Sequence, residues 1–264
     1  GLQGWIPLYM TGQISPYYLK GVQNNVYCHF LNVSGSAALS GECVAGAHAQ
    51  GRYELVKGGE ALRYFRDRAA AIQRKALPLM DIYREDQAAA FRAFLASDAR
   101  STGARTRLLA SPPISTLRNE TLQAMLAARD LPPADCRRIL EHAAAQRDRM
   151  ETVLTHSPVS DAFPALTREE FERYPPALPL SEMFFDRNLR YTYAEYCRHA
   201  EETQAFAAAR SGYTVRPCDA AFRNISIAVR AGEWALVSKN GSPAIHFVIR
   251  YPKLRGAIEA FLGG

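Results

Sequence analysis

Apolar runs separated by glycine and proline divide this chain into short strands and amphipathic helices. Residues 224–262 predict a strand, a tight turn at Ala231-Gly232, a second strand, a loop at 240–243, a third strand and a helix after Pro252. Residues 26–70 show the same order, with strands at 26–33, 37–44 and 53–56 and then a helix with apolar residues three and four positions apart. NVSGSAALS (32–40) falls beside VRAGEWALV (229–237). We interpret the two stretches as copies of one unit.

The middle of the chain has the periodicity of helices. We expect helices at 77–95, 120–129, 132–155, 167–173 and 191–210, and strands at 106–110 and 213–216. Thr167 and Glu170 have the spacing of a capping box at the start of one helix. The pattern therefore predicts an α/β (α+β) fold, in which a pseudo-symmetric mixed sheet is built from both chain ends around a helical insertion. The expected domains are 1–76 (first half of the sheet), 77–210 (largely helical insertion) and 211–264 (second half).

The first 25 residues are rich in aromatic side chains, glycine and proline. Trp5, Tyr9, Tyr17 and Tyr18 are too many large rings for a free tail, so we expect this segment to pack on the sheet. Two interpretations stay open, since such rings either cover a core or form the wall of a ligand site.

Composition places the chain among ordinary globular proteins. It has 264 residues, of which 48% are hydrophobic and 22% charged. The net charge of +6 comes from scattered arginines without a run of five, which is typical of a solvated surface and leaves an anionic partner as the alternative. Five cysteines without a CxxC pair favour a reducing cytoplasm. No apolar run approaches the ~18 residues of a membrane span, and no signal peptide is visible. The start at Gly1, without methionine, is what an excised fragment of a longer protein would show.

Motifs that carry known chemistry are missing from the sequence. GxxxxGK[ST], GxGxxG after a strand, HExxH and GxSxG do not occur, and the six histidines lack the spacing of metal ligands. Cys28 and His29 are neighbours, but adjacent residues of a strand point to opposite faces. We therefore predict no catalytic residue, no metal site and no cofactor.

The repeated unit resembles the half-domain of the phospholipase-D-like superfamily, through its strand, glycine turn, AlaAlaLeuSerGly and following strand and helix. That resemblance implies a His-x-Lys and a downstream acid before the glycine of each half. The equivalent places hold Tyr27, His29 and Ser34 in the first copy and Asn224, Ser226 and Ala231 in the second. Since the nucleophile and its acid partner are both missing, the resemblance implies a non-catalytic fold.

Two further stretches resemble bacterial regulators that carry an N-terminal helix-turn-helix ahead of an effector portion. They are WIPLYMTG (5–12) with ISPYY (14–18), and the segment 226–249. The resemblance covers about a third of the chain. It implies transcription regulation, with a DNA-binding domain that would precede Gly1.

These patterns favour a non-catalytic, cytoplasmic ligand-sensing and dimerisation region of a bacterial transcription regulator. The partners implied are a small-molecule effector, anionic if the nearby arginines contact it, a second copy in a homodimer, and DNA only through a domain outside this chain. The effector would bind near the pseudo-twofold axis, and the candidate ligand-binding residues are Tyr17, Tyr18, Tyr27, His29, Trp234 and His246. Two alternatives stay open: a diverged phosphodiesterase that uses His29, and a basic scaffold that binds nucleic acid.

Overall fold

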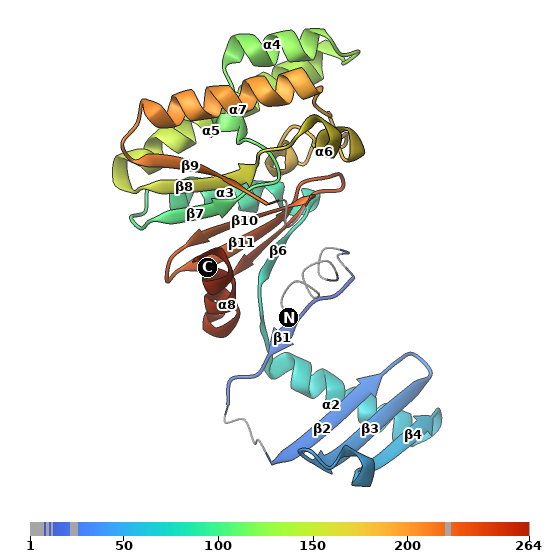
Figure 1. Ribbon diagram of the computed structural model, residues 1–264. Helices are drawn as coiled ribbons and strands as arrows, with labels where there is room; N and C mark the ends of the chain where they lie inside the picture. Colours follow the sequence, from blue (N-terminus) through green and yellow to red (C-terminus); the bar gives the residue numbers. More distant parts are fainter. Residues whose placement is uncertain (1–7, 9–10, 12, 22–25, 220–222, 264) are drawn as a thin grey trace. The chain divides into compact units, whose positions relative to one another are not determined.

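A computed structural model describes residues 8, 11, 13–21, 26–219 and 223–263. The chain forms two compact units. The small unit is Ser15–Leu79, and the large unit combines Met80–Gly264 with the residues before Ser15. Figure 1 labels the elements of each unit. Both units mix helices and strands, as the sequence pattern predicts.

The small unit is a three-stranded antiparallel sheet with one helix on it. The sheet has the order β2-β3-β4, with β2 at Tyr27–Val33, β3 at Ala37–Val44 and β4 at Arg52–Lys57. A 3-10 turn, η1 (His48–Gln50), joins β3 to β4, and α2 (Gly59–Lys75) follows. Two short strands, β1 (Tyr17–Tyr18) and β5 (Leu77–Pro78), pair separately. The core is small, because Ala38, Leu62 and Phe65 are its buried members among the described residues.

The sheet of the small unit has one covered face and one open face. On the covered face, Ala38 is the register partner of Val56, and both pack with Leu31 against α2. Side chains alternate along a strand, so the intervening residues form the other face. Phe30, Tyr53 and Leu55 lie there and are 49%, 51% and 60% exposed. The open face is therefore largely apolar.

The large unit is built around a seven-stranded mixed sheet with the order β6-β12-β11-β10-β7-β8-β9. Its strands β7, β8 and β9 run parallel, and the other neighbours are antiparallel. The bounds are β6 Asp81–Tyr83, β7 Arg105–Leu108, β8 Val159–Pro164, β9 Tyr213–Cys218, β10 Ile225–Arg230, β11 Trp234–Lys239 and β12 Ile245–Ile249. Helical connections join the parallel strands, as parallel pairing requires.

Helices cover both faces of this sheet. The α-helices are α3 (Ala88–Ala99), α4 (Asn119–Ala127), α5 (Pro133–His156), α6 (Arg168–Arg173), α7 (Tyr193–Ala208) and α8 (Pro252–Gly263), and the 3-10 turns are η2 (Glu85–Gln87), η3 (Ile114–Thr116) and η4 (Ser181–Met183). Figure 1 shows α8 on the side of the sheet away from α5 and α7. Trp234, Leu236 and Val248 pack with Phe91 of α3. Side chains alternate between the two faces along β11 and β12, so Ala235 and Phe247 point to the opposite face, toward α8.

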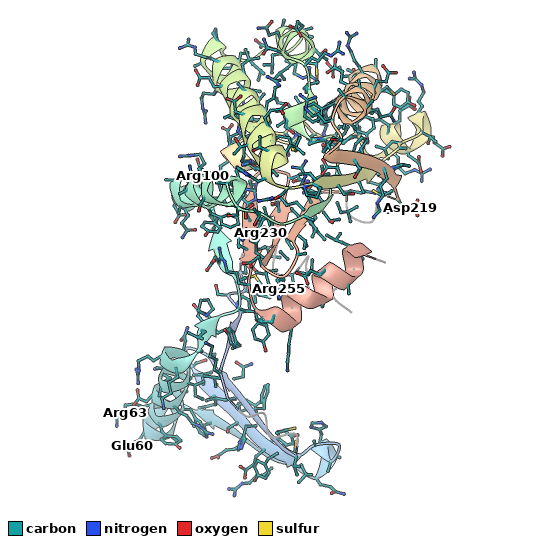
Figure 2. All side chains as sticks on the ribbon, turned by 90° about the vertical axis from the view of Figure 1, so that its left-hand side faces the viewer. Glu60, Arg63, Arg100, Asp219, Arg230 and Arg255 are labelled. Atoms are coloured by element: carbon teal, nitrogen blue, oxygen red, sulfur yellow. The ribbon has the colours of Figure 1, made fainter. Side chains whose placement is uncertain are left out.

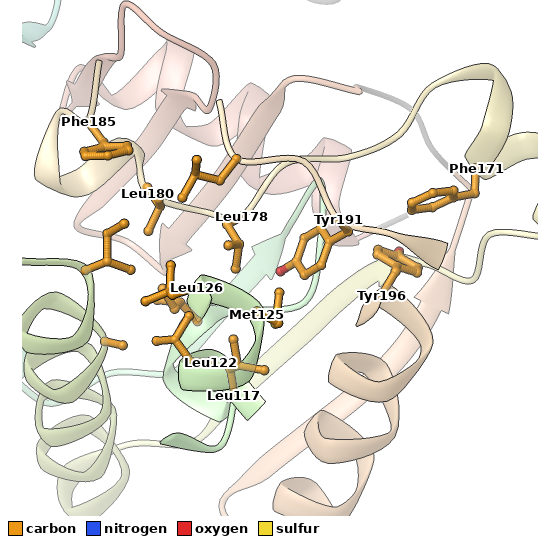
Figure 3. Packing of buried hydrophobic residues seen from close by; sticks show 14 residues of the cluster. Leu117, Leu122, Met125, Leu126, Phe171, Leu178, Leu180, Phe185, Tyr191 and Tyr196 are labelled. Carbon is orange, nitrogen blue, oxygen red and sulfur yellow. The ribbon is translucent and has the colours of Figure 1, made fainter. Parts of the chain in front are cut away.

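The largest hydrophobic cluster joins α4, α5 and α7 to the segment before α7. Leu117 and Leu122 are fully buried in it, and Leu178, Leu180 and Tyr191 approach from that segment (Figure 3). The capping box at the start of α6 is confirmed, since Thr167 Oγ1 accepts from Glu170 N at 3.3 Å and Glu170 Oε2 accepts from Thr167 N at 2.8 Å.

The prediction of one pseudo-symmetric sheet from both chain ends is wrong. The first copy closes its own three-stranded sheet, and β10, β11 and β12 of the second copy belong to the seven-stranded sheet. The stretch 77–210 supplies β6, β7 and β8 to that sheet, so it is part of the fold and not an insertion beside it. The expected boundary at 76 falls close to Leu79, whereas residues 80–210 and 211–264 lie within one unit.

The helix expected at 77–95 is also wrong in its first half. Pro78 has no N–H for a helix, and the segment forms β5 and β6 before α3 begins at Ala88. Tyr17 and Tyr18 form β1, as part of the small unit, whereas Trp5 and Tyr9 lie outside the described residues. Across the described part of the chain, no helix has both the length and the apolar composition to cross a bilayer.

Candidate ligand-binding site

A polar row interrupts the apolar face of the large sheet below α3. Ser226 of β10 lies opposite Ser238 of β11, and Ser238 lies opposite His246 of β12. The next row on the same face is apolar, with Ala228, Leu236 and, on β12, Val248. The polar row therefore marks one end of the sheet, where β7 ends and β10 begins.

His246 is held as a neutral side chain within this row. It is fully buried, its Nε2 lies 3.0 Å from Ser181 O, and its Nδ1 lies 2.8 Å from Ser238 Oγ. A carbonyl oxygen can only accept, so Nε2 carries the proton and Nδ1 accepts from the Ser238 hydroxyl. Burial lowers the pKa of His246, against the effects of the Ser181 bond and of Glu182. The ring also stacks on Phe91, with a centroid separation of 4.1 Å.

An inner chamber of about 80 Å³ opens beside the polar row. Five serines line it from five different segments, and they are joined by Asn240, Gln146, His142 and two arginines. The serines are Ser111, Ser115, Ser181, Ser226 and Ser238, and the arginines are Arg107 and Arg149. Asn240 Nδ2 donates to Ser226 Oγ at 2.8 Å, which fixes one wall of the chamber.

An outer chamber of about 470 Å³ lies next to the inner one, between α3 and α5. Four side chains line both cavities: His142, Gln146, Arg149 and Glu182. Arg92 and Arg100 add positive charge to the outer chamber, and Asp148 adds one carboxylate. Arg100 directly follows the last residue of α3 (Figure 2).

An ion pair occupies the junction of the two chambers. Arg149 Nη2 donates to Glu182 Oε2 at 2.7 Å and also to Gln146 Oε1. Burial alone would raise the pKa of Glu182, but the charge and hydrogen bond of Arg149, with His142 acting in the same direction, overcome it and lower the pKa to about 2. Glu182 is therefore a carboxylate throughout the physiological range.

A second ion pair forms part of the floor. The Asp161 carboxylate of β8 is fully buried and accepts from Arg107 Nε at 2.6 Å and from Arg107 Nη2 at 2.5 Å. It also accepts from Tyr213 Oη at 2.6 Å. Three parallel strands are thereby joined through one carboxylate. Arg107 reaches the chamber with its charge already compensated.

Two buried polar atoms of the chamber lack a hydrogen-bond partner within the described protein. They are Ser115 Oγ and His142 Nε2. The other atoms in this condition, Arg230 Nε and Arg255 Nε, lie 3.2 Å from carboxylates of Asp98 and Glu259. Burial lowers the pKa of His142, with Arg149 acting in the same direction and Glu182 against it. At neutral pH the chamber therefore presents a hydroxyl and a neutral imidazole nitrogen, and both need a partner from outside the chain.

The predicted site residues belong to two different units. Tyr17, Tyr18, Tyr27 and His29 belong to the small unit, whereas Trp234 and His246 belong to the large unit. The Trp234 indole is buried and donates from Nε1 to Asp98 Oδ1 at 2.8 Å, and it packs among Phe94, Leu236 and Val248. The polar atoms of Trp234 and His246 are thus hydrogen-bonded within the protein, although both residues lie close to the chambers.

The single sheet that the phospholipase-D-like resemblance implies for its two half-sites is not formed. His29 lies on β2, and Asn224 precedes β10 of a different sheet. Tyr27 is 43% exposed, and its ring lies 5.0 Å from that of His29 on the same face of β2. The residues of the two expected half-sites therefore belong to different sheets.

The residues that line the chambers were not among the predicted ones. Ser226 stands at the position where the phospholipase-D-like resemblance implies a lysine, and the sequence indicates no other role for it. One feature of the sequence does indicate the site: three consecutive apolar strands each carry a hydroxyl or imidazole side chain on the face that is buried. Buried strands seldom carry polar side chains at matching positions without a reason. His142 and Gln146 are one turn apart on α5, but the sequence alone gives no reason to aim them at β7.

Comparisons of the chain with protein-family models, with curated proteins and with solved structures give no match. In the described ranges, no group of three or more His, Cys, Asp and Glu side chains is arranged to hold a metal ion. The evidence for the candidate site is therefore its geometry in this structure.

Proposed function

We propose that this chain is the ligand-sensing portion of a cytoplasmic transcription regulator, and that its effector is a small polar molecule bound in the two chambers of the large unit. The observation that carries the proposal is the pair of buried groups without protein partners, Ser115 Oγ and His142 Nε2, on the wall of one chamber. An unpartnered buried polar group costs about 1–3 kcal/mol. A bound molecule that hydrogen-bonds to both atoms offsets that cost.

The size and position of the chambers support this proposal. The outer chamber of about 470 Å³ has the volume of an ordinary small-molecule site, in the range of about 300–1,000 Å³. The inner chamber adjoins the carboxyl end of β7, through Leu109 and Ser111. Crevices at the carboxyl ends of parallel strands are the usual binding places in open α/β sheets.

The charge pairs of the inner chamber favour hydroxyl or amide groups on the part of the ligand that lies there. Arg107 is paired with Asp161 and Arg149 with Glu182, so neither arginine offers an uncompensated charge. The serines, Asn240 and Gln146 supply neutral donors and acceptors in larger number. The anionic effector expected from the arginines stays a prediction, and so do the homodimer and the DNA-binding domain that the regulator resemblance implies.

A ligand screen on Ser115→Ala and wild-type protein tests the proposal. Thermal unfolding would be followed with single additions of neutral sugars, polyols, amino acids, hexose phosphates and dicarboxylates. A ligand at 100 times its Kd stabilises the folded state by about 2.7 kcal/mol. We expect a hit for the wild type. In Ser115→Ala the stabilisation by that hit should fall by at least half, while the protein without ligand keeps or gains stability, because the variant removes an unpartnered buried hydroxyl.

The matched control is Ser36→Ala, which removes an exposed serine hydroxyl from the turn between β2 and β3. It should respond to the hit as the wild type does. Equal ligand stabilisation in Ser115→Ala and Ser36→Ala would rule out the inner chamber as the site. If mass spectrometry shows that the protein converts the hit into new products, the proposed sensing function would be wrong and the site would be catalytic.

A further inference from the structure

Two cysteines oppose each other on the open face of the small sheet. Cys28 of β2 is the direct register partner of Cys43 of β3, and both thiols are partly exposed and free. Directly opposed residues of antiparallel strands have Cα atoms about 4.5–5.5 Å apart. Disulfides in proteins span Cα separations of about 4.4–6.8 Å. The strand register therefore brings the two thiols to a separation that a disulfide can bridge.

One of these thiols has a base beside it. The Cys43 Sγ atom lies 3.1 Å from Nδ1 of His48, an exposed residue of η1. An imidazole nitrogen at this distance is in the position of a general base for the thiol, and the thiolate is the nucleophilic form of cysteine. Cys28 has His29 as its neighbour in sequence, but His29 lies opposite Glu42 on the other face of the sheet.

The loop that carries His48 is fitted closely to Cys43. A Cβ atom at Gly51 would lie 2.8 Å from Cys43 Cβ and 2.9 Å from Glu42 O, so only glycine allows this approach. Tyr53 Oη donates to His48 O at 3.0 Å, and the Tyr53 ring lies over Gly41, where a Cβ would come within 2.5 Å of it. Side chain and backbone contacts thus hold the imidazole at the thiol, on a rigid strand pair.

We propose that Cys28 and Cys43 form a dithiol that reduces hydroperoxides and is converted to a cross-strand disulfide, with His48 as the base. The Cys43 thiolate attacks one peroxide oxygen; an S–O bond forms, the O–O bond breaks, and the alcohol or water leaves with the proton that His48 took up. The Cys28 thiol then attacks the sulfenic sulfur, an S–S bond forms, and water leaves. Two thiols lose two electrons and two protons, and the hydroperoxide gains them.

This reactive pair is independent of the chambers of the large unit. Cys136, Cys197 and Cys218 lie in that unit, and each is partly exposed like Cys28 and Cys43. They serve as reference thiols within the same molecule, because none is the register partner of another cysteine in the described strands.

The experiment treats the reduced full chain with hydrogen peroxide, and separately with tert-butyl hydroperoxide, at substoichiometric to tenfold amounts. Peptide mass spectrometry would identify a Cys28–Cys43 link, and differential alkylation would give the rate at each of the five cysteines. We expect the link to form at least about tenfold faster than oxidation of Cys136, Cys197 or Cys218. Cys28→Ser should stop the reaction at a sulfenic acid on Cys43, trapped by dimedone.

His48→Ala is expected to slow the reaction of Cys43 by about tenfold or more, the lower range of a lost general base. His29→Ala is the matched control, since it removes a histidine next to Cys28 from the opposite face, and its rate should equal that of the wild type. Circular dichroism would confirm that both variants are folded. Even oxidation of all five cysteines, cross-links between chains, or equal rates in His48→Ala and His29→Ala would overturn the proposal.

Discussion

Replacing Asp161 with asparagine is expected to lower the free energy of unfolding by about 3–5 kcal/mol, because it leaves a buried guanidinium without its counter-charge. Asp161 is fully buried, and its carboxylate accepts from Arg107 and from Tyr213. Burial by itself would lower the pKa of Arg107, but the Asp161 carboxylate outweighs it and raises that pKa. The variant loses that effect, but the ordinary pKa of a guanidinium is about 12.5 or higher, so Arg107 is expected to stay charged and to keep the cost of its burial.

Asp81→Asn is the control for this prediction. Asp81 pairs with Arg250, and the side chains of this pair are 44% and 51% exposed. Exposed pairs contribute about 0–1 kcal/mol, so the control should unfold nearly as the wild type does. Chemical denaturation of the three proteins gives the comparison. A loss of less than about 1 kcal/mol in Asp161→Asn would mean that Arg107 finds another partner and that the floor of the site is not held by this pair.

Acidification from neutral pH is expected to destabilise the protein before its carboxylates titrate. His199 is fully buried, its Nε2 donates to Pro113 O at 3.0 Å, and its Nδ1 accepts from Tyr191 Oη at 2.8 Å. Burial lowers the pKa of His199 from 6.5 to about 4, against smaller effects of the Pro113 bond and Glu202. Between these two values the unfolded chain binds a proton that the folded chain does not.

The sign of the effect follows from that difference in bound protons. Stability is complete above the unfolded pKa of 6.5, falls as the pH drops below it, and stops falling below about 4. His199 alone accounts for about 3 kcal/mol across this window, at about 1.4 kcal/mol per pH unit. His142 and His246, whose pKa values are also lowered by burial, add to the loss.

Unfolding free energies of the wild type and His199→Gln, measured between about pH 5 and 8, test this account. On the acid side, the free energy of unfolding of the variant should change with pH by about 1.4 kcal/mol per pH unit less than that of the wild type, whatever its stability at neutral pH. His156→Gln removes an exposed histidine and should keep the slope of the wild type. Equal slopes in all three proteins would show that folding does not lower the pKa of His199.

Local structure followed from the sequence where short-range chemistry decides it. The Thr167–Glu170 capping box, the turn at Ala231-Gly232 and the three strands after Ile225 depend on neighbouring residues, and all of them are confirmed. Gly232 has a φ of 77°, a conformation that glycine adopts without strain.

Pairing between distant strands did not follow from the sequence. A repeated order of elements says nothing about which strand edges meet, so two similar stretches were placed in one sheet although they form two. The edge of β10 is paired with β7, whose short RTRL segment carries two arginines and reads poorly as a central strand. Asp98 and Asp161 neutralise those arginines. Asp98 lies seven residues before Arg105, but Asp161 lies 54 residues after Arg107, and no local pattern in the sequence pairs the latter two.

The candidate site was missed for the same reason. The sequence pattern indicates aromatic side chains and histidines as ligand groups, but the polar atoms of Trp234 and His246 are hydrogen-bonded to Asp98, Ser238 and Ser181. The groups left without partners, on Ser115 and His142, can be recognised only when every bond around them is counted.

The most direct test of the account follows the imidazole resonances of His142 by nuclear magnetic resonance while the effector found in the thermal screen is added. The Nε2 atom of His142 is buried, lines the inner chamber and has no protein partner in the described residues. We predict a saturable shift of the His142 resonances with the same Kd as the thermal stabilisation, and no shift at the exposed His48 and His156. Thermal stabilisation that leaves His142 unchanged would contradict the proposal that the effector binds in these chambers.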